Sequence, residues 1–451
     1  MLEPDFLGGV VEGFYGRPWL HIQRLHLIDR LAALGLNTYF YAPKNDLNQR
    51  AIWREPYDDA QLSLFRQLVN ACRQHGLNFI YGLSPGLDIS FSDAAERDRI
   101  KRRFAQLHEL GARHFALLFD DLPGRMSDDD RRAYPSLAAA QCDVTNAIFD
   151  WARKQGARGR FLFCPTPYCD RMDRAQHGGA GYLDAVGRLL DPAIDILWTG
   201  PEIVSQTIPM ESIEQLSQRI GGRPVIWDNL FANDYDARRL HCGPYSGRGR
   251  ELRGAVRGIL INPNNEYPIN FIALRTLAAY LNGESEWEPR AEYLQSAADW
   301  LACYETVTKP ITLDELILLA DCFYLPHAEG PEAIKLLSLI DRLLAEPVSS
   351  WGDCYEQFCA INARIQALFD RLTELRDREL FDAWSRRVWA LKEELQIIDA
   401  ALAQKKAGRD LSTGIELESC LPGTFRGGIL VRLESYLIFD DDGRIRAERV
   451  P

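Results

Sequence analysis

Two adjacent carboxylic acids, Asp120 and Asp121, directly follow the apolar run FALLF at residues 115–119. Such a pair can carry out acid–base chemistry, because one carboxyl group can donate a proton while the other stays ionised. Other acidic pairs, such as Asp58-Asp59, lie in polar segments that are typical of solvated turns. The apolar run instead predicts a partly desolvated pair at the end of a β-strand. From this pattern alone, a catalytic role and a structural role are both open.

Other residues with polar or aromatic side chains also stand at the ends of apolar runs. They are Glu12-Gly13-Phe14-Tyr15, Lys44, Tyr168, Trp227-Asp228-Asn229 and Asn262. Each has an ordinary alternative, since a lysine can form a salt bridge with a loop, an aromatic ring can belong to the core and an asparagine can form a turn. If these residues meet, they supply an ammonium group, amides and aromatic planes beside two carboxylates. Such a set suits a neutral, hydroxyl-rich ligand such as a sugar.

Eight apolar runs, separated by segments long enough for a helix, would have to position these residues. The runs span residues 8–14, 37–43, 78–86, 114–122, 160–168, 195–200, 224–229 and 258–263. Strands that alternate with helices predict a parallel sheet. A doubly wound open sheet shares this alternation, but no GxGxxG or P-loop sequence follows the first run. The pattern therefore favours a (β/α)8 TIM barrel, in which loops at the C-terminal ends of the strands form the active site.

The sequence pattern changes after about Asn282, where long helical patterns such as residues 379–406 replace the alternation of strands and helices. Near the C-terminus, residues 434–450 predict two short strands around an Asp-Gly turn. The predicted fold class is therefore α/β, a (β/α)8 barrel followed by a mainly helical C-terminal domain. The predicted domains are the barrel at 1–282, the helical domain at 283–407 and a small mixed segment with a β-hairpin at 408–451.

Composition excludes several classes of function. The 64 acidic residues outnumber the 52 basic ones and give a net charge of −12, which disfavours a nucleic-acid partner. No apolar stretch approaches the length of a membrane span, and the N-terminus lacks the features of a signal peptide, so we expect a cytoplasmic protein without a membrane partner. The ten cysteines and eight histidines show no ligand spacing. We therefore expect neither a metal nor another cofactor.

Eight long motifs occur in order through about residues 7–280. They are GVVEGFYGRPW, NTYFYAPKND, SPGLDISFS, FALLFDDLP, FLFCPTPYC, ILWTGPEIVS, VIWDNLFANDYD and INPNNEYPIN. Together they resemble the serial motifs of glycoside hydrolase family 84, which comprises the O-GlcNAc hydrolases and related bacterial β-N-acetylglucosaminidases. The (β/α)8 barrel of that family agrees with the strand pattern. The resemblance implies a retaining exo-β-N-acetylglucosaminidase that acts on a β-GlcNAc-bearing glycoprotein or glycoside.

The resemblance also implies roles for particular residues. Asp120 would polarise the acetamido group of the substrate, and Asp121 would act as general acid and then as general base. The implied substrate-binding residues are Gly13 and Lys44 beside the sugar, Tyr168, Trp227 and Asn229 around the acetamido group, and Asp234 and Asn262 at the sugar hydroxyls.

The implied mechanism is substrate-assisted, with the 2-acetamido oxygen attacking the anomeric carbon to form an oxazoline. Two alternatives stay open. One is a hyaluronidase or chitinase-like endo-hydrolase, which an extended cleft would favour. The other is a carbohydrate-binding scaffold without catalysis, against which the intact Asp120-Asp121 pair argues.

Overall fold

The computed structural model describes residues 3, 5–85, 88–283, 287–409, 429–439 and 445–447. The chain forms two compact units, and each unit is made of segments that are not consecutive in the sequence. Unit 1 comprises Met1–Asp234, Tyr245–Asn265 and Leu277–Trp287, and unit 2 comprises Tyr235–Pro244, Glu266–Thr276 and Glu288–Pro451.

Unit 1 is built around a closed barrel of eight parallel strands in the order β1 to β8, with β8 pairing back onto β1. This confirms the predicted (β/α)8 architecture. The strands are β1 (Leu7–Glu12), β2 (Thr38–Tyr41), β3 (Asn78–Leu83), β4 (His114–Leu118), β5 (Phe161–Cys164), β6 (Ile194–Trp198), β7 (Val225–Asp228) and β8 (Gly258–Ile261).

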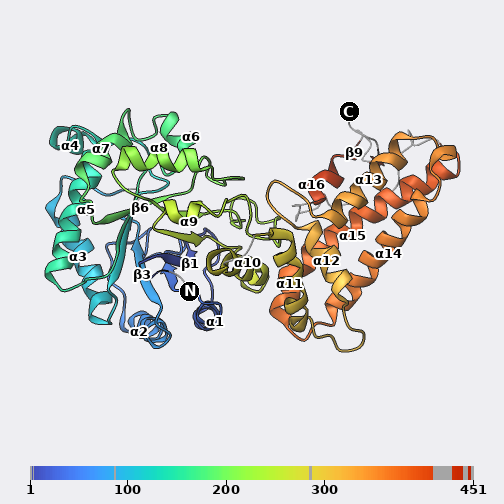
Figure 1. The fold of residues 1–451 in the computed structure, drawn as a ribbon, viewed down its shortest axis with the longest axis horizontal. Helices are drawn as coiled ribbons and strands as arrows, with labels where there is room; N and C mark the ends of the chain where they lie inside the picture. The colour runs from blue at the N-terminus through green and yellow to red at the C-terminus, as the bar shows by residue number, and fades with distance from the viewer. Residues whose placement is uncertain are drawn as a thin grey trace. The chain divides into compact units, whose positions relative to one another are not determined.

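Helices connect these strands and cover the outside of the barrel (Figure 1). They are α1 (His21–Ala33), α2 (Asp59–Gln74), α3 (Ala94–Glu109), α4 (Asp128–Ala133), α5 (Leu137–Lys154), α6 (Asp170–Arg174), α7 (Tyr182–Leu189), α8 (Met210–Ile220) and α9 (Leu252–Ala255). After β8 follow the short 3-10 helix η1 (Tyr267–Asn270) and α10 (Phe271–Asn282), whose residues up to Thr276 belong to unit 2 and whose remaining residues belong to unit 1. Helix α2 shows why such segments are helical. Asp58 and Gln61 form a reciprocal capping box at its start, and Phe65, Leu68 and Cys72 form its buried face.

The strands end earlier than the apolar runs suggest. The run at 114–122 contains β4, which ends at Leu118, and the run at 160–168 contains β5, which ends at Cys164. The residues beyond these ends are still buried, as Phe119 and Thr166 show. Because burial continues into the loops, hydrophobicity alone does not mark the point where strand pairing stops.

The interior of the barrel is filled by side chains that point inward from alternating strand positions. The buried cluster includes Val11, Phe40, Leu118 and Leu162, and it extends to Trp227. The Phe40 and Trp227 rings meet edge to face with centroids 5.8 Å apart. The Trp227 ring, near the C-terminal end of β7, is therefore packed against the core of the barrel.

Unit 2 is mainly helical, with a core that contains Trp300, Phe323 and Trp384. Its elements are α11 (Pro289–Trp300), η2 (Leu301–Cys303), α12 (Leu313–Cys322), α13 (Pro331–Ala345), η3 (Val348–Ser350), α14 (Cys354–Thr373), α15 (Arg378–Lys406), α16 (Ile429–Glu434), β9 (Leu437–Phe439) and β10 (Ile445–Ala447). Helices α12 to α15 pack against one another in sequence (Figure 1).

Strands β9 and β10 pair antiparallel. The Asp-Gly turn that the sequence predicts between them lies outside the described residues. Among the helices that the structure describes, none combines the length and apolarity needed to cross a bilayer.

Candidate active site

Asp120 lies just beyond β4 and is almost fully buried, with 7% of its surface exposed. Its Oδ2 atom forms an ion pair with Lys44 Nζ at 2.6 Å, and Lys44 also reaches Ser84 Oγ at 3.4 Å. The Oδ1 atom of Asp120 is buried and has no hydrogen-bond partner among the described residues. Leaving a buried acceptor unpaired costs about 1–3 kcal/mol, so this oxygen is suited to receive an N–H group from a bound molecule.

Asp121, by contrast, is exposed, and its backbone adopts the left-handed region with φ of 55°. A non-glycine residue in that region is uncommon, and such residues cluster at functional sites. Two tyrosine hydroxyls hold its carboxylate: Tyr168 donates to Oδ1 and Tyr15 donates to Oδ2, both at 2.8 Å. Each carboxylate oxygen thus has its own donor, which fixes the orientation of the group.

The two tyrosines remain protonated donors over the working pH range. Burial, and then the negative charge of Asp121, raise the pKa of Tyr15 and the pKa of Tyr168 well above the ordinary value for a phenol. Neither hydroxyl is therefore expected to lose its proton near neutral pH. Both tyrosines therefore stay available as hydrogen-bond donors to the Asp121 carboxyl group.

Trp227, Asn229, Asn262 and Gly13 form a second, connected group above the barrel core. The Asn229 Oδ1 atom accepts hydrogen bonds from Trp227 Nε1 and from Asn262 Nδ2, both at 3.0 Å. The Asn262 Oδ1 atom in turn accepts the Gly13 backbone N–H at 3.3 Å. A Cβ atom on Gly13 would lie 2.0 Å from the Trp227 ring, so only glycine leaves room for the indole.

Lys44 links the two groups, because its ammonium lies 5.6 Å from the centroid of the Trp227 ring. Asp234 is half-buried and joins through Tyr15, whose backbone N–H donates to its Oδ2 atom at 2.8 Å. The structure thus brings all nine residues predicted from the sequence into one contiguous set in unit 1.

Two residues that contact the pair were not predicted as site residues. Tyr15 holds Asp121, as described above, and Arg50 lies with its guanidinium carbon 5.6 Å from the Tyr15 ring centroid. Arg50 Nη2 also approaches the Asp121 carbonyl at 3.5 Å. Tyr15 stands in the polar ending of the first apolar run, but the sequence assigns it no role. Arg50 stands in no apolar run and carries no such signal.

A buried ion pair supports the end of β7 on the side that faces away from the candidate site. Asp228, between Trp227 and Asn229, accepts hydrogen bonds from Arg248 Nε and Nη2, both at 2.7 Å, and from the Tyr245 hydroxyl at 2.9 Å. Both charged side chains are completely buried. This pair fixes the backbone that carries the indole and the amide of the site.

The chain also matches known proteins over much of its length. A family model described as beta-N-acetylglucosaminidase matches residues 8–313. The chain is similar to the protein O-GlcNAcase of Rattus norvegicus and to that of Mus musculus, each 47% identical over 275 residues, which is 61% of this chain and 30% of the rodent protein. It therefore spans less than a third of the length of these relatives.

Among solved structures, the chain resembles a mutant of the Thermobaculum terrenum O-GlcNAc hydrolase. The TM-score is 0.78 and the sequence identity 28%, with 89% of this chain and 87% of that chain covered. The likeness thus extends beyond the barrel to most of both chains.

Proposed function

Because the chain belongs to the β-N-acetylglucosaminidase family, glycoside hydrolase family 84, we propose that it is a retaining exo-β-N-acetylglucosaminidase. Its substrate would be a terminal β-linked GlcNAc, in particular O-GlcNAc on serine or threonine of a glycoprotein. The observation that carries the proposal is the Asp120-Asp121 pair, with a buried, unpartnered oxygen on Asp120 and a doubly held carboxyl on Asp121.

In the first step, the 2-acetamido oxygen of the substrate attacks the anomeric carbon and closes an oxazoline ring. Asp121 gives its proton to the leaving oxygen as the glycosidic bond breaks. Asp120 accepts the acetamido N–H at Oδ1 and balances the positive charge that develops on the ring. The Lys44 ion pair at Oδ2 holds the Asp120 side chain in place and leaves Oδ1 for the acetamido group. Because the nucleophile is already tethered to the sugar, its attack is favoured by several kcal/mol.

In the second step, Asp121 acts as the base. Its carboxylate removes a proton from water, which attacks the anomeric carbon and opens the oxazoline with net retention. Tyr15 and Tyr168 hold the carboxyl in place through both steps. The other candidate residues would bind the sugar. The Trp227 ring and Asn229 would lie at the acetamido group, Gly13 along the sugar, and Asn262 and Asp234 at its hydroxyls.

We also propose a cytoplasmic location. The support is that nine cysteines among the described residues are free thiols, whereas oxidising compartments favour disulfides.

The function is tested by assaying an aryl β-N-acetylglucosaminide together with a thiazoline analogue of the oxazoline. We expect turnover, and competitive inhibition by the thiazoline at least about 100-fold tighter than substrate binding, because the site recognises the cyclised intermediate. Three results would contradict the proposal: binding of sugar without turnover, cleavage only inside chitin or hyaluronan chains, or a covalent glycosyl-enzyme trapped by a fluorosugar.

A further inference from the structure

A pocket with a volume of about 830 Å³ lies in unit 1, at the end of the barrel where the strands begin. Its lining includes Phe6, Arg160, Arg223 and Arg257, which directly precede or stand shortly before β1, β5, β7 and β8. Asp120 and Asp121 follow the opposite, C-terminal end of β4. Because all eight strands are parallel, the pocket and the candidate active site lie at opposite ends of the barrel.

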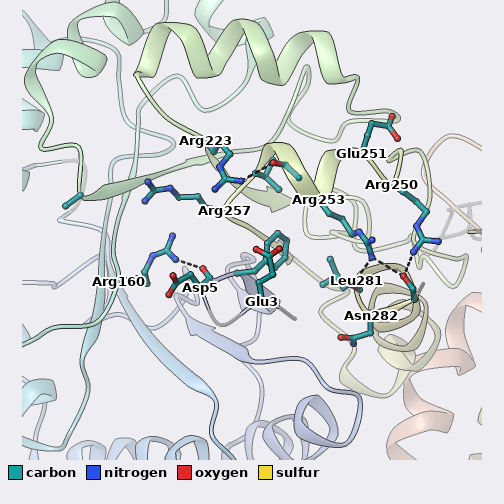
Figure 2. A pocket seen from close by; sticks show the side chains of 15 residues that line it. Glu3, Asp5, Arg160, Arg223, Arg250, Glu251, Arg253, Arg257, Leu281 and Asn282 are labelled. Atoms are coloured by element: carbon teal, nitrogen blue, oxygen red, sulfur yellow. Dashed lines mark hydrogen bonds between the residues drawn. The ribbon is translucent and has the colours of Figure 1, made fainter. Parts of the chain in front are cut away.

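Five arginines line this pocket, although the chain as a whole is acidic. Figure 2 shows Arg160, Arg223 and Arg257 on one side of the pocket and Arg250 and Arg253 on the other. The acidic lining residues are fewer, namely Glu3, Asp5 and Glu251. A pocket with an excess of guanidinium groups on two sides concentrates positive potential where the rest of the molecule is negative.

The ion pairs of these arginines do not neutralise the pocket. Within the described residues they go to the buried Asp195, which binds Arg160 at 2.5 Å and Arg257 at 3.1 Å. Glu3, Asp5 and Glu251 form no ion pair with the five guanidinium groups in that part of the chain. One buried carboxylate therefore serves two arginines, and the other three have no carboxylate partner among the described residues.

Backbone carbonyls hold three of the guanidinium groups. Arg253 Nη1 donates to Leu281 at 2.9 Å, Arg223 Nη1 donates to Gly254 at 3.0 Å, and Arg250 Nη2 donates to Gly283. In each case the other terminal nitrogen has no partner among the described residues. Arg160 Nη2 is buried and likewise without a hydrogen-bond partner there. The guanidinium groups are thus positioned by the fold while keeping donors for a further acceptor.

From these observations we propose that the pocket binds a small anion of the diphosphate or polyphosphate class. Guanidinium forks match phosphate oxygens bidentately, and two groups of arginines on opposite sides suit a ligand with more than one anionic group. The volume lies within the range of about 300–1,000 Å³ that is usual for small-molecule sites. The apolar side chains of Phe6, Val256 and Leu281 complete the wall and accept an uncharged part of such a ligand.

The proposal is tested by titrating the full chain with pyrophosphate in a calorimeter at about 150 mM salt, where weak surface attraction is screened. We expect one site with a dissociation constant below about 1 mM. Saturating the candidate active site with a thiazoline sugar should leave this binding unchanged. The double substitution Arg223→Gln and Arg257→Gln should weaken it by about tenfold or more. Arg223 is exposed and Arg257 is half-exposed, and the buried Asp195 keeps Arg160 as its partner when Arg257 is replaced.

Arg66→Gln is the matched control, because Arg66 is an exposed arginine of unit 1 on α2 and lies outside the pocket. Its loss should not change pyrophosphate binding. Absence of binding would overturn the proposal. So would equal weakening by the double substitution and by Arg66→Gln, or displacement of pyrophosphate by the thiazoline sugar, since these results assign the binding to general charge or to the active site.

Discussion

At the scale of single residues, the proposed chemistry depends on how Asp121 is held. A carboxyl group that first donates and then accepts a proton must keep its orientation through two steps. A carboxyl group without hydrogen-bond partners would rotate freely between them. Tyr15 and Tyr168 each donate to a different carboxylate oxygen at 2.8 Å. Both hydroxyls stay protonated near neutral pH, since burial and then Asp121 raise the pKa of each phenol.

The Tyr15→Phe substitution tests this role. A hydrogen bond to a charged group contributes about 1.5–3 kcal/mol, so we expect kcat/KM for substrates with poor leaving groups to fall by roughly tenfold or more. In an Asp121→Asn background the same substitution should add little further loss, because Tyr15 acts through Asp121. Steady-state kinetics of the two single variants and the double variant measure this coupling.

Tyr134→Phe is the matched control, because its hydroxyl also donates to a carboxylate, that of Asp143, at 2.8 Å. It contacts none of the nine candidate residues and should keep wild-type kinetics. If Tyr15→Phe were equally harmful with and without Asp121, its role in positioning the acid would be wrong.

The predictability of the site differs from residue to residue. Asp120 and Asp121 stand out because an apolar strand precedes them, and the motifs supply the other seven positions. Arg50 could not be found in this way, since its contact with Tyr15 joins loops that follow different strands. Contacts of this kind depend on loop conformation, which apolar periodicity does not encode.

At the scale of secondary-structure elements, β7 contains the site residue Trp227, and Asn229 directly follows the strand. A buried ion pair at Asp228 supports this end of β7. Asp228 points away from the site toward Arg248, while its neighbours Trp227 and Asn229 hydrogen-bond to each other. Successive side chains of an extended chain point to opposite sides. Trp227 and Asn229 therefore face the candidate site, while Asp228 between them faces the supporting ion pair.

Arg248→Met is expected to destabilise the protein strongly. It leaves the Asp228 carboxylate buried without its main partner, and breaking a buried pair in this way costs about 3–5 kcal/mol. Arg171→Met removes a partner from an exposed pair, that of Arg171 and Glu202, which should change stability by less than about 1 kcal/mol. Denaturant unfolding of the two variants compares them, and equal stabilities would contradict the importance of the buried pair.

The sequence distinguishes strands from helices because their hydrophobic patterns differ. The eight strands and the barrel could be predicted from this difference. The ends of the strands were not predictable, since burial continues past Leu118 and Cys164 into the loops. The role of Asp228 was likewise hidden. A carboxylate inside a strand gives no indication of an arginine twenty positions later that neutralises it.

At the scale of the whole molecule, the two units are not consecutive in sequence. Segments Tyr235–Pro244 and Glu266–Thr276 belong to unit 2, although they lie between parts of the barrel. Leu240, Cys242, Ile269 and Ile272 from these segments are buried in the helical core. The sequence shows only that long helical patterns begin after Asn282. The predicted domain boundary at 282 rests on that pattern and not on contacts between segments, and it stays a prediction.

A fragment of residues 1–287 should therefore be less stable than the full chain, although it contains all of unit 1. It would expose the four apolar side chains that the helical core buries, each worth about 1.5–3 kcal/mol when fully buried. We expect a lower Tm and aggregation relative to the full chain, measured by calorimetry and light scattering. A monomeric fragment with the Tm and kinetics of the full chain would contradict the interleaved organisation.

The central claim is that Asp121 is the acid and base and Asp120 the partner of the acetamido group. The most direct measurement is kcat/KM for a series of aryl β-N-acetylglucosaminides of differing leaving-group ability with the wild type, Asp121→Asn and Asp120→Asn. Asp121→Asn should lose about 10²–10⁴-fold on poor leaving groups and little on activated ones, because only poor ones need the proton. Asp120→Asn should lose about 10²–10³-fold on all of them, because the acetamido group must be oriented whatever departs. The same leaving-group dependence in both variants, or near wild-type turnover of Asp120→Asn, would contradict the account.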